Sequence, residues 1–177
     1  MGTDRLTWFN DMPAHDARRA LAECCAAPGW AAQMAAARPY GAAHDAIRQS
    51  STIVAQLTIP DLAAALAGHP RIGEHQKSNP NNVEPGRSAA DWSRREQAGV
   101  DEHDVQTRQA LAAANVEYER RFGHIYLVCA SGRTGQELLQ LLRGRLLNRP
   151  DDEWQVVRAE LQKINALRLE RFLAGSS

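Results

Sequence analysis

The sequence predicts an all-α, single-domain bundle of about eight to nine helices with one short extended link, and three observations support this fold class. Most of the chain divides into segments with helical spacing of apolar residues, bounded by capping residues, proline or glycine. Only residues 124–130 form an extended-type apolar run, and one such segment cannot make a sheet. The 177 residues show no repeat or break in composition, so one domain over residues 1–177 is expected.

The first half of the chain is expected to contain four helices, over residues 13–27, 30–37, 43–57 and 60–67. Asn10 is expected to cap the first of them, and Pro28-Gly29 to end it. Pro60 suits the first turn of the fourth helix, and Gly68 supplies its end. The apolar spacing predicts a buried position for Leu21, Cys24, Cys25, Ile47, Val54 and Leu57.

The second half is expected to contain four more helices, over residues 88–99, 101–122, 134–147 and 151–173. Their predicted caps are Ser88, Asp101, the Thr-x-x-Glu capping box of Thr134 and Glu137, and Asp151. Gly123 should stop the helix that ends at Phe122. The predicted packing residues are Leu111, Ala114, Val116, Tyr118, Trp154, Val157, Leu161, Ile164, Leu167, Phe172 and the leucines at 138, 139, 141, 142, 146 and 147.

The longest irregular segment, residues 69–87, opens with His-Pro-Arg-Ile-Gly at 69–73. A proline steers the preceding residue away from α geometry, so His69 is expected at a helix end with its ring free to face a cleft. Histidine can exchange protons near neutral pH, which makes His69 a candidate acid or base. A capping or structural histidine is the alternative interpretation. Long loops inside compact domains are usually functional or disordered.

A second candidate lies on the helix that follows this loop. Ser93, Glu96 and Gln97 stand at i, i+3 and i+4, so they project from one helix face. The hydroxyl, carboxylate and amide together offer donors and acceptors to a small ligand. A solvated helix face is the alternative, which the neighbouring Arg94 and Arg95 favour.

Composition limits the classes of partner. The 21 basic and 21 acidic residues give a formal net charge of zero, which argues against nucleic acid. Three cysteines form no disulfide framework, which indicates a reducing compartment. We find neither a signal peptide nor an apolar run long enough to span a bilayer, so a cytoplasmic protein without membrane contact is expected.

Other chemical sites find less support. His69, Glu74 and His75 lack metal-site spacing, and no metal is expected. Residues 131–135 lack the Lys-Ser/Thr ending of a phosphate loop, and the capping box already accounts for Thr134. Cys129 lies in an apolar run and is expected to be a small core residue rather than a nucleophile.

Four motifs occur in a fixed order along the chain. They are His-Pro-Arg-Ile-Gly at 69–73, Ser-Arg-Arg-Glu-Gln-Ala-Gly at 93–99, Asn-Val-Glu-Tyr-Glu-Arg-Arg-Phe-Gly at 115–123 with its apolar continuation to Ala130, and Leu-Arg-Leu at 167–169. Together with Arg38-Pro39-Tyr40, this ordered set closely resembles the OHCU decarboxylase family, which acts on 2-oxo-4-hydroxy-4-carboxy-5-ureidoimidazoline (OHCU) in urate breakdown. The resemblance spans about residue 5 to residue 173.

The resemblance implies an all-α fold, usually a homodimer, and a carboxy-lyase that needs neither metal nor organic cofactor. Its small-molecule substrate would be OHCU and its product (S)-allantoin. The catalytic histidine of the family falls on His69 and the paired acidic residue on Glu96. The substrate-binding residues fall on Pro70, Ser93, Gln97, the backbone of Tyr126, Leu127, Val128, Cys129 and Ala130, and Arg168. Arg71 replaces the Asp of many relatives, which alters the loop and not the chemistry.

Two other functions stay open on the residues themselves. In one, the chain is a non-enzymatic helical module that binds a ligand or a partner, His69 is a cap, and the face of Ser93 is surface. In the other, the same residues serve a decarboxylase or hydrolase that acts on a related ureide.

Overall fold

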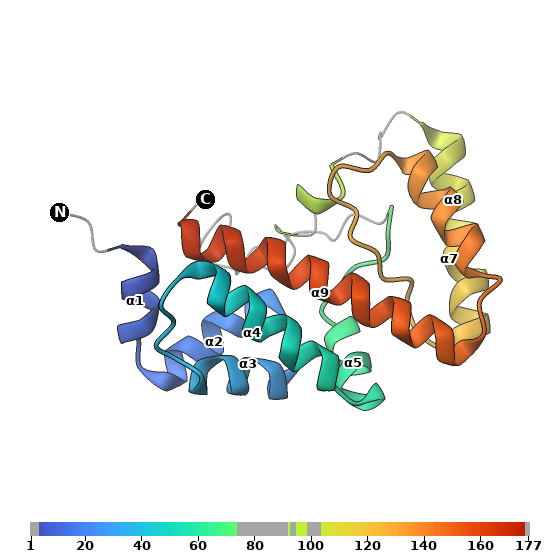
Figure 1. Ribbon diagram of the computed structural model, residues 1–177. Helices are drawn as coiled ribbons and strands as arrows, with labels where there is room; N and C mark the ends of the chain where they lie inside the picture. Colours follow the sequence, from blue (N-terminus) through green and yellow to red (C-terminus); the bar gives the residue numbers. More distant parts are fainter. Residues whose placement is uncertain (1–3, 74–91, 93–94, 99–103, 176–177) are drawn as a thin grey trace. The chain divides into compact units, whose positions relative to one another are not determined.

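The computed structural model describes residues 4–73, 92, 95–98 and 104–175 (Figure 1). Within these ranges it contains eight α-helices and no β-strand, so the all-α prediction is confirmed. The helices are α1 (Arg5–Asp11), α2 (Ala14–Cys24), α3 (Pro28–Ala36), α4 (Ala43–Gln56), α5 (Ile59–Leu66), α7 (Val105–Phe122), α8 (Gly135–Arg145) and α9 (Pro150–Ala174). Most of the helix expected over 88–99, with its cap Ser88, lies outside the described residues.

The chain groups into two compact units. Unit 1 comprises Met1–Gly68 and Leu161–Ser177, and unit 2 comprises His69–Glu160. The division therefore falls directly before His69 and, again, inside α9. The expectation of a single domain over residues 1–177 stays a prediction.

In unit 1, α3 packs against α2, α4 and α5 (Figure 1). Trp30 of α3 is fully buried, and its indole Nε1 donates to Ser50 Oγ of α4 over 3.0 Å. This bond satisfies the polar atom of a large buried side chain and joins two helices. Leu21, Cys24, Cys25, Val54 and Leu57 are buried as predicted, whereas Ile47 is only half-buried.

The start of the chain differs from the prediction. Asn10 is not a cap; it lies inside α1, and its side chain accepts from the Tyr40 amide and donates to the Tyr40 carbonyl, both over 2.9 Å. Arg38 Nη1 donates to the carbonyls of Phe9 and Met12, over 2.6 and 2.7 Å. α1 is seven residues long, so its position depends on these distant partners rather than on local signals.

Pro28 has another role than the one expected, whereas Gly68 follows the end of α5 as expected and has a packing role as well. Pro28 does not end a helix but occupies the first position of α3, where its missing N–H costs nothing. α2 has already ended at Cys24. Beyond α5, a Cβ atom at Gly68 would lie 2.7 Å from the Cβ of Ala26, so close approach of two segments explains this glycine.

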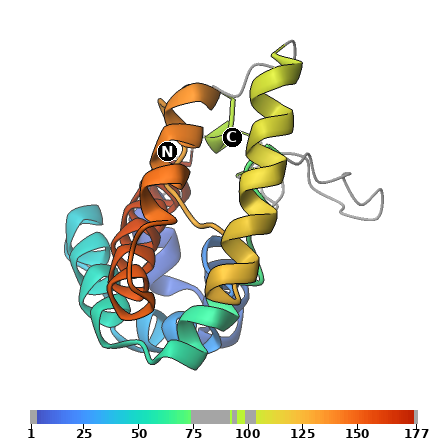
Figure 2. The ribbon, with the colours of Figure 1, turned by 90° about the vertical axis from the view of Figure 1, so that its right-hand side faces the viewer.

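In unit 2, α7 packs against α8. Figure 2 shows α7 as one uninterrupted yellow helix. Its cap is Asp104, whose Oδ1 accepts from the Thr107 amide over 2.9 Å; the expected cap Asp101 lies outside the described residues. Gly123 ends α7 at φ 75°, a left-handed conformation that glycine adopts without strain, and the predicted capping box of Thr134 begins α8.

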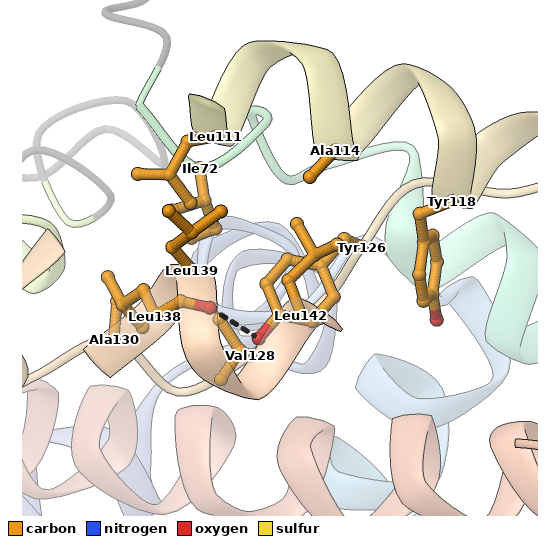
Figure 3. Close-up of a cluster of buried hydrophobic side chains, with 10 residues drawn as sticks. All are labelled: Ile72, Leu111, Ala114, Tyr118, Tyr126, Val128, Ala130, Leu138, Leu139 and Leu142. Carbon is orange, nitrogen blue, oxygen red and sulfur yellow. Dashed lines mark hydrogen bonds between the residues drawn. The ribbon is translucent and has the colours of Figure 1, made fainter. Parts of the chain in front are cut away.

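The core of unit 2 lies between α7, α8 and the extended link (Figure 3). Tyr126, Val128 and Ala130 contribute from the link, and the Tyr126 hydroxyl donates to the Leu138 carbonyl over 3.4 Å. The other members are Ile72, Leu111, Ala114, Tyr118, Leu138, Leu139 and Leu142. Val116 and Leu147, which we expected to pack, are 68% and 84% exposed.

The ends of α9 also need small corrections. Asp151 lies inside the first turn of a helix that begins at Pro150, so it does not cap it. Leu169 is fully buried, whereas Leu167 is half-buried. In the described part of the chain, no helix combines the length and apolar character that a membrane crossing requires.

Candidate functional site

His69 is the first residue of unit 2 and follows the end of α5, as predicted. Its side chain is largely buried, and Pro70 beside it is half-buried. A histidine in this position is shielded from bulk water, which suits a group that must exchange a proton with one bound molecule.

Two residues of α7 hold the loop that begins at His69. Arg71 forms a two-bond ion pair with Glu119, over 2.5 and 2.9 Å. Asn115, which is almost fully buried, donates from Nδ2 to the Ile72 carbonyl over 2.9 Å. Because both anchors lie on one rigid helix, the loop is held at Arg71 and Ile72, directly after His69 and Pro70.

A third contact of this loop joins it to the second candidate segment. The backbone N–H of Gly73 donates to Gln97 Oε1 over 2.9 Å. Gly73 adopts φ +84°, a conformation open to glycine, which turns the loop at the point of contact. Glu96, directly before Gln97, is 7% exposed. The loop of His69 and the turn of Glu96 therefore meet, although they are more than twenty residues apart. Ser93 lies outside the described residues.

The extended link is held by charged side chains from two helices. Arg145 of α8 donates from Nη1 to the Leu127 carbonyl over 2.6 Å. Glu160 of α9 accepts at Oε2 from the Cys129 amide over 2.8 Å. The Cys129 carbonyl accepts from Arg133 Nε over 3.2 Å. The Ala130 carbonyl accepts from the Arg133 amide over 3.0 Å. Of the five residues expected to bind substrate through their backbone, three thus have internal partners.

The side chains of the link alternate. Tyr126, Val128 and Ala130 enter the core cluster of unit 2, whereas Cys129 is half-buried and not the core residue we expected. This period of two is that of an extended chain. Among the described residues, none hydrogen-bonds to the backbone of Val128. Val128 is 5% exposed, so its N–H and C=O are polar groups that a ligand could satisfy.

Arg145, which binds the link, also belongs to a buried network of charged and hydroxyl side chains. Glu153, fully buried at the start of α9, accepts from Arg145 Nε over 2.7 Å and from the hydroxyl of Tyr118. Burial is the largest single effect and works to lower the pKa of the Arg145 guanidinium. The bond to Glu153, together with the charges of Glu153 and of the two tyrosines, outweighs it and raises this pKa. Burial raises the pKa of Tyr126 to about 12, and that of Tyr118 further, so both hydroxyls stay protonated at neutral pH.

Arg168 belongs to unit 1. It is almost fully buried, and its Nη1 donates to the Cys24 carbonyl over 3.0 Å. Burial raises the pKa of the neighbouring Cys25 thiol, so this cysteine is a poor nucleophile.

No metal-type cluster of three or more His, Cys, Asp or Glu side chains occurs in the described ranges. Glu74 and His75, the other members of the rejected metal set, lie outside those ranges.

Sequence reasoning missed Asn115, Arg145, Glu153 and Glu160. The sequence contains a pattern that could have indicated two of them. Glu153 and Glu160 fall on the same helix face as Val157 and Ile164, at spacings of three and four residues, and a carboxylate on an apolar helix face is costly unless it has partners. No local pattern identifies the partners themselves.

Together these features define a class of protein. It is an all-α protein in which a shielded histidine, a buried glutamate, a glutamine side chain and an extended backbone segment belong to one compact unit. The sequence profile of OHCU decarboxylase matches residues 10–170. The chain therefore belongs to the OHCU decarboxylase family, as its ordered motifs predicted.

Individual relatives agree with this assignment. The chain is 32% identical to the uric acid degradation bifunctional protein TTL of Arabidopsis thaliana, over 87% of its own length and 46% of that protein. It is 28% identical to a 2-oxo-4-hydroxy-4-carboxy-5-ureidoimidazoline decarboxylase of Amia calva, over 81% of its own length and 79% of that protein. A crystal structure of OHCU decarboxylase in the presence of (S)-allantoin matches with a TM-score of 0.70 and 30% identity, over 87% of this chain and 96% of that chain. The chain spans about half the length of the Arabidopsis relative and 32% of a bifunctional relative from a Bacillus strain.

Proposed function

We propose that this protein decarboxylates OHCU to (S)-allantoin without a metal or an organic cofactor. The observation that carries the proposal is the bond between Gly73 and Gln97, because it brings the loop of the candidate base to the turn of the candidate carboxylate inside one unit. Family membership over residues 10–170 supports the choice of substrate.

The reaction requires few groups. Loss of carbon dioxide from C4 leaves an electron pair that the adjacent C5=N system accepts, and C5 is then protonated on one face. An enzyme can promote this by orienting the departing carboxylate and by placing one proton-transfer group. His69 is proposed to exchange the proton of the C4 hydroxyl. Glu96 is proposed to hold the histidine ring or the ureido group.

The remaining groups bind and orient the substrate. Gln97 uses its Oε1 for Gly73, which leaves its two amide N–H donors for substrate oxygens. Val128 offers one N–H and one C=O, a pair that matches the alternating donors and acceptors of a cyclic urea. Pro70 and the backbone around Val128 would close the pocket wall against water.

Ser93 and Arg168 are assigned to the substrate by resemblance alone. A guanidinium is suited to a carboxylate because it presents a planar fork of donors. Arg168→Lys keeps the charge and loses the fork, so the assignment expects a higher KM for OHCU in that variant. A KM equal to that of the wild type would remove Arg168 from the binding site.

The proposal also includes a homodimer in the cytoplasm, as the resemblance implies. Light scattering of the purified chain on a sizing column measures the oligomeric state directly. A monomer at micromolar concentration would contradict the dimer.

The proposed function is tested by a coupled assay. Urate oxidase and the hydrolase that follows it generate OHCU from urate, and circular dichroism then follows allantoin. Spontaneous decay yields racemic allantoin, so an optical signal reports enzymatic turnover. We expect a rapid dextrorotatory signal from the wild type and none above the uncatalysed rate from His69→Ala.

His44→Ala is the matched control, because His44 is a surface histidine with a 73% exposed side chain. It should turn over at the wild-type rate. Near-normal turnover by His69→Ala would refute the role of His69. Racemic product at the uncatalysed rate from the wild type would refute the activity itself.

A further inference from the structure

Two oppositely charged side chains occupy one edge of the extended link. Arg145 binds the Leu127 carbonyl and Glu160 binds the Cys129 amide, over 2.6 and 2.8 Å. In an extended chain, the N–H and C=O of residues i and i+2 face the same edge, and those of the residue between them face the other. The two charged contacts therefore hold the edge opposite to that of Val128.

A carboxylate at the position of Glu160 lowers the stability of the fold. Its side chain is 8% exposed, and it lies between Val157 and Ile164 on the buried face of α9. A buried carboxylate pays a large desolvation cost, and an apolar side chain would serve stability as well or better. Its bond to a backbone N–H is, however, stronger and more directional than a bond between neutral groups. The carboxylate of Glu160 therefore serves to hold the Cys129 amide in place rather than to stabilise the fold.

We propose that Glu160 is a positioning residue, which fixes the Cys129 amide and thereby holds the N–H and C=O of Val128 in the orientation that binds substrate. The inference rests on the proposed function. Arg145 assists from the adjacent residue, since its bond to Leu127 fixes the same edge. Together the two contacts prevent the link from rotating about its own axis.

The test compares Glu160→Gln and Glu160→Ala with the wild type in the coupled assay. Glutamine keeps an oxygen that can accept from Cys129, whereas alanine has none. Displacement of a binding group by about 1 Å can cost up to 10²-fold in rate. We therefore expect Glu160→Ala to raise the KM for OHCU roughly tenfold or more, and Glu160→Gln to stay within about threefold of the wild type.

Glu170→Gln is the control on the same helix, because Glu170 is exposed. It should match the wild type in KM and in thermal midpoint. A purely structural role for Glu160 would instead lower the amount of folded protein, and hence the apparent kcat, without a change in KM. That pattern would overturn the proposal, as would a KM in Glu160→Gln as high as in Glu160→Ala.

A second measurement is independent of turnover. Amide hydrogen exchange of Cys129, followed by NMR, should be slow in the wild type and in Glu160→Gln and fast in Glu160→Ala. Equal protection in all three would overturn the proposed contact. A wild type without turnover but with this exchange pattern would instead refute the proposed function and leave the contact in place.

Discussion

Gln97 accepts a hydrogen bond from the backbone N–H of Gly73 over 2.9 Å, and this contact joins two motifs that are separate in the sequence. It fixes Gly73 within the loop that begins at His69 and uses the oxygen of the Gln97 amide. The two N–H donors of the amide are available to a ligand. The acceptor and the donors of this side chain can therefore be tested separately.

Gln97→Leu and Gln97→Glu separate these two roles. Leucine removes the acceptor of the Gly73 amide, so we expect a loss of about 1 kcal/mol in the free energy of unfolding and a strongly reduced kcat/KM. Glutamate keeps an oxygen for Gly73 but loses the N–H donors, so stability should hold while KM rises. Urea unfolding and the coupled assay measure the two effects. A Gln97→Glu enzyme with wild-type KM would show that the donors do not bind substrate.

The ion pair of Arg71 and Glu119 predicts a pH dependence of stability. The bond to Arg71 lowers the pKa of the Glu119 carboxyl, against the smaller effect of burial. A lowered pKa in the folded state stabilises the protein above the unfolded value of about 4.3, and this stabilisation is lost as the pH falls through the folded pKa. Arg71 and Glu119 are 43% and 25% exposed, so the contribution is small, about 0 to 1 kcal/mol.

Glu119→Gln tests this pair. The wild type should exceed the variant in unfolding free energy at pH 7, and the difference should shrink as the pH is lowered from 5 to 3. Added salt should reduce it as well. A difference that is constant over this pH range would mean that the pair adds no charge-dependent stability.

The buried charge of Glu153 makes a stronger prediction. Glu153→Ala leaves the Arg145 guanidinium buried without its main counter-charge, which costs about 3 to 5 kcal/mol. Asp152→Asn, one residue earlier and exposed, should be nearly neutral. The double variant Arg145→Met with Glu153→Leu should recover much of the loss, because neither charge remains. Urea unfolding of the wild type, Arg145→Met, Glu153→Leu and the double variant measures the coupling. Losses in the two single variants that add up to the loss in the double variant would contradict it.

The absorbance of the three tyrosines of the chain tests whether their hydroxyls are buried in the cores of the two units. Tyr40, Tyr118 and Tyr126 are all buried, and burial raises the pKa of Tyr40 and of Tyr126 to about 12. Phenolate absorbance should therefore be nearly absent from the native protein at pH 10, whereas the urea-unfolded chain should be about half ionised there. A raised pKa stabilises the fold below pH 10, and this contribution is lost as the pH rises from 10 towards 12. A native titration near pH 10 would show that a tyrosine is exposed.

Much of this protein follows from local sequence. The capping box of Thr134, the glycine stop at Gly123 and the helical spacing of apolar residues predicted most helix ends within a few residues. These signals are local because each concerns hydrogen bonds between neighbouring residues. The proline after His69 likewise placed this histidine at a helix end, and the ordered motifs identified the family.

Other features depend on partners that are distant in the chain. α1 is too short to form by itself; Arg38 holds it through the Phe9 carbonyl, and Tyr40 holds it through the side chain of Asn10. Gly68 is explained only by the nearby Ala26. The same is true of the candidate site. Asn115 and Glu119, which hold the loop, and the charged side chains that hold the link lie on helices for which the sequence predicted only packing roles.

The sequence alone therefore determined the all-α class, the family and the candidate residues His69, Glu96 and Gln97, because helix periodicity and motif order are properties of neighbours. Only the tertiary structure decided that Gln97 binds Gly73 and that Glu160 binds Cys129. The reason is physical: a buried polar group must find a partner wherever the folded chain supplies one, and that partner need not be near in sequence.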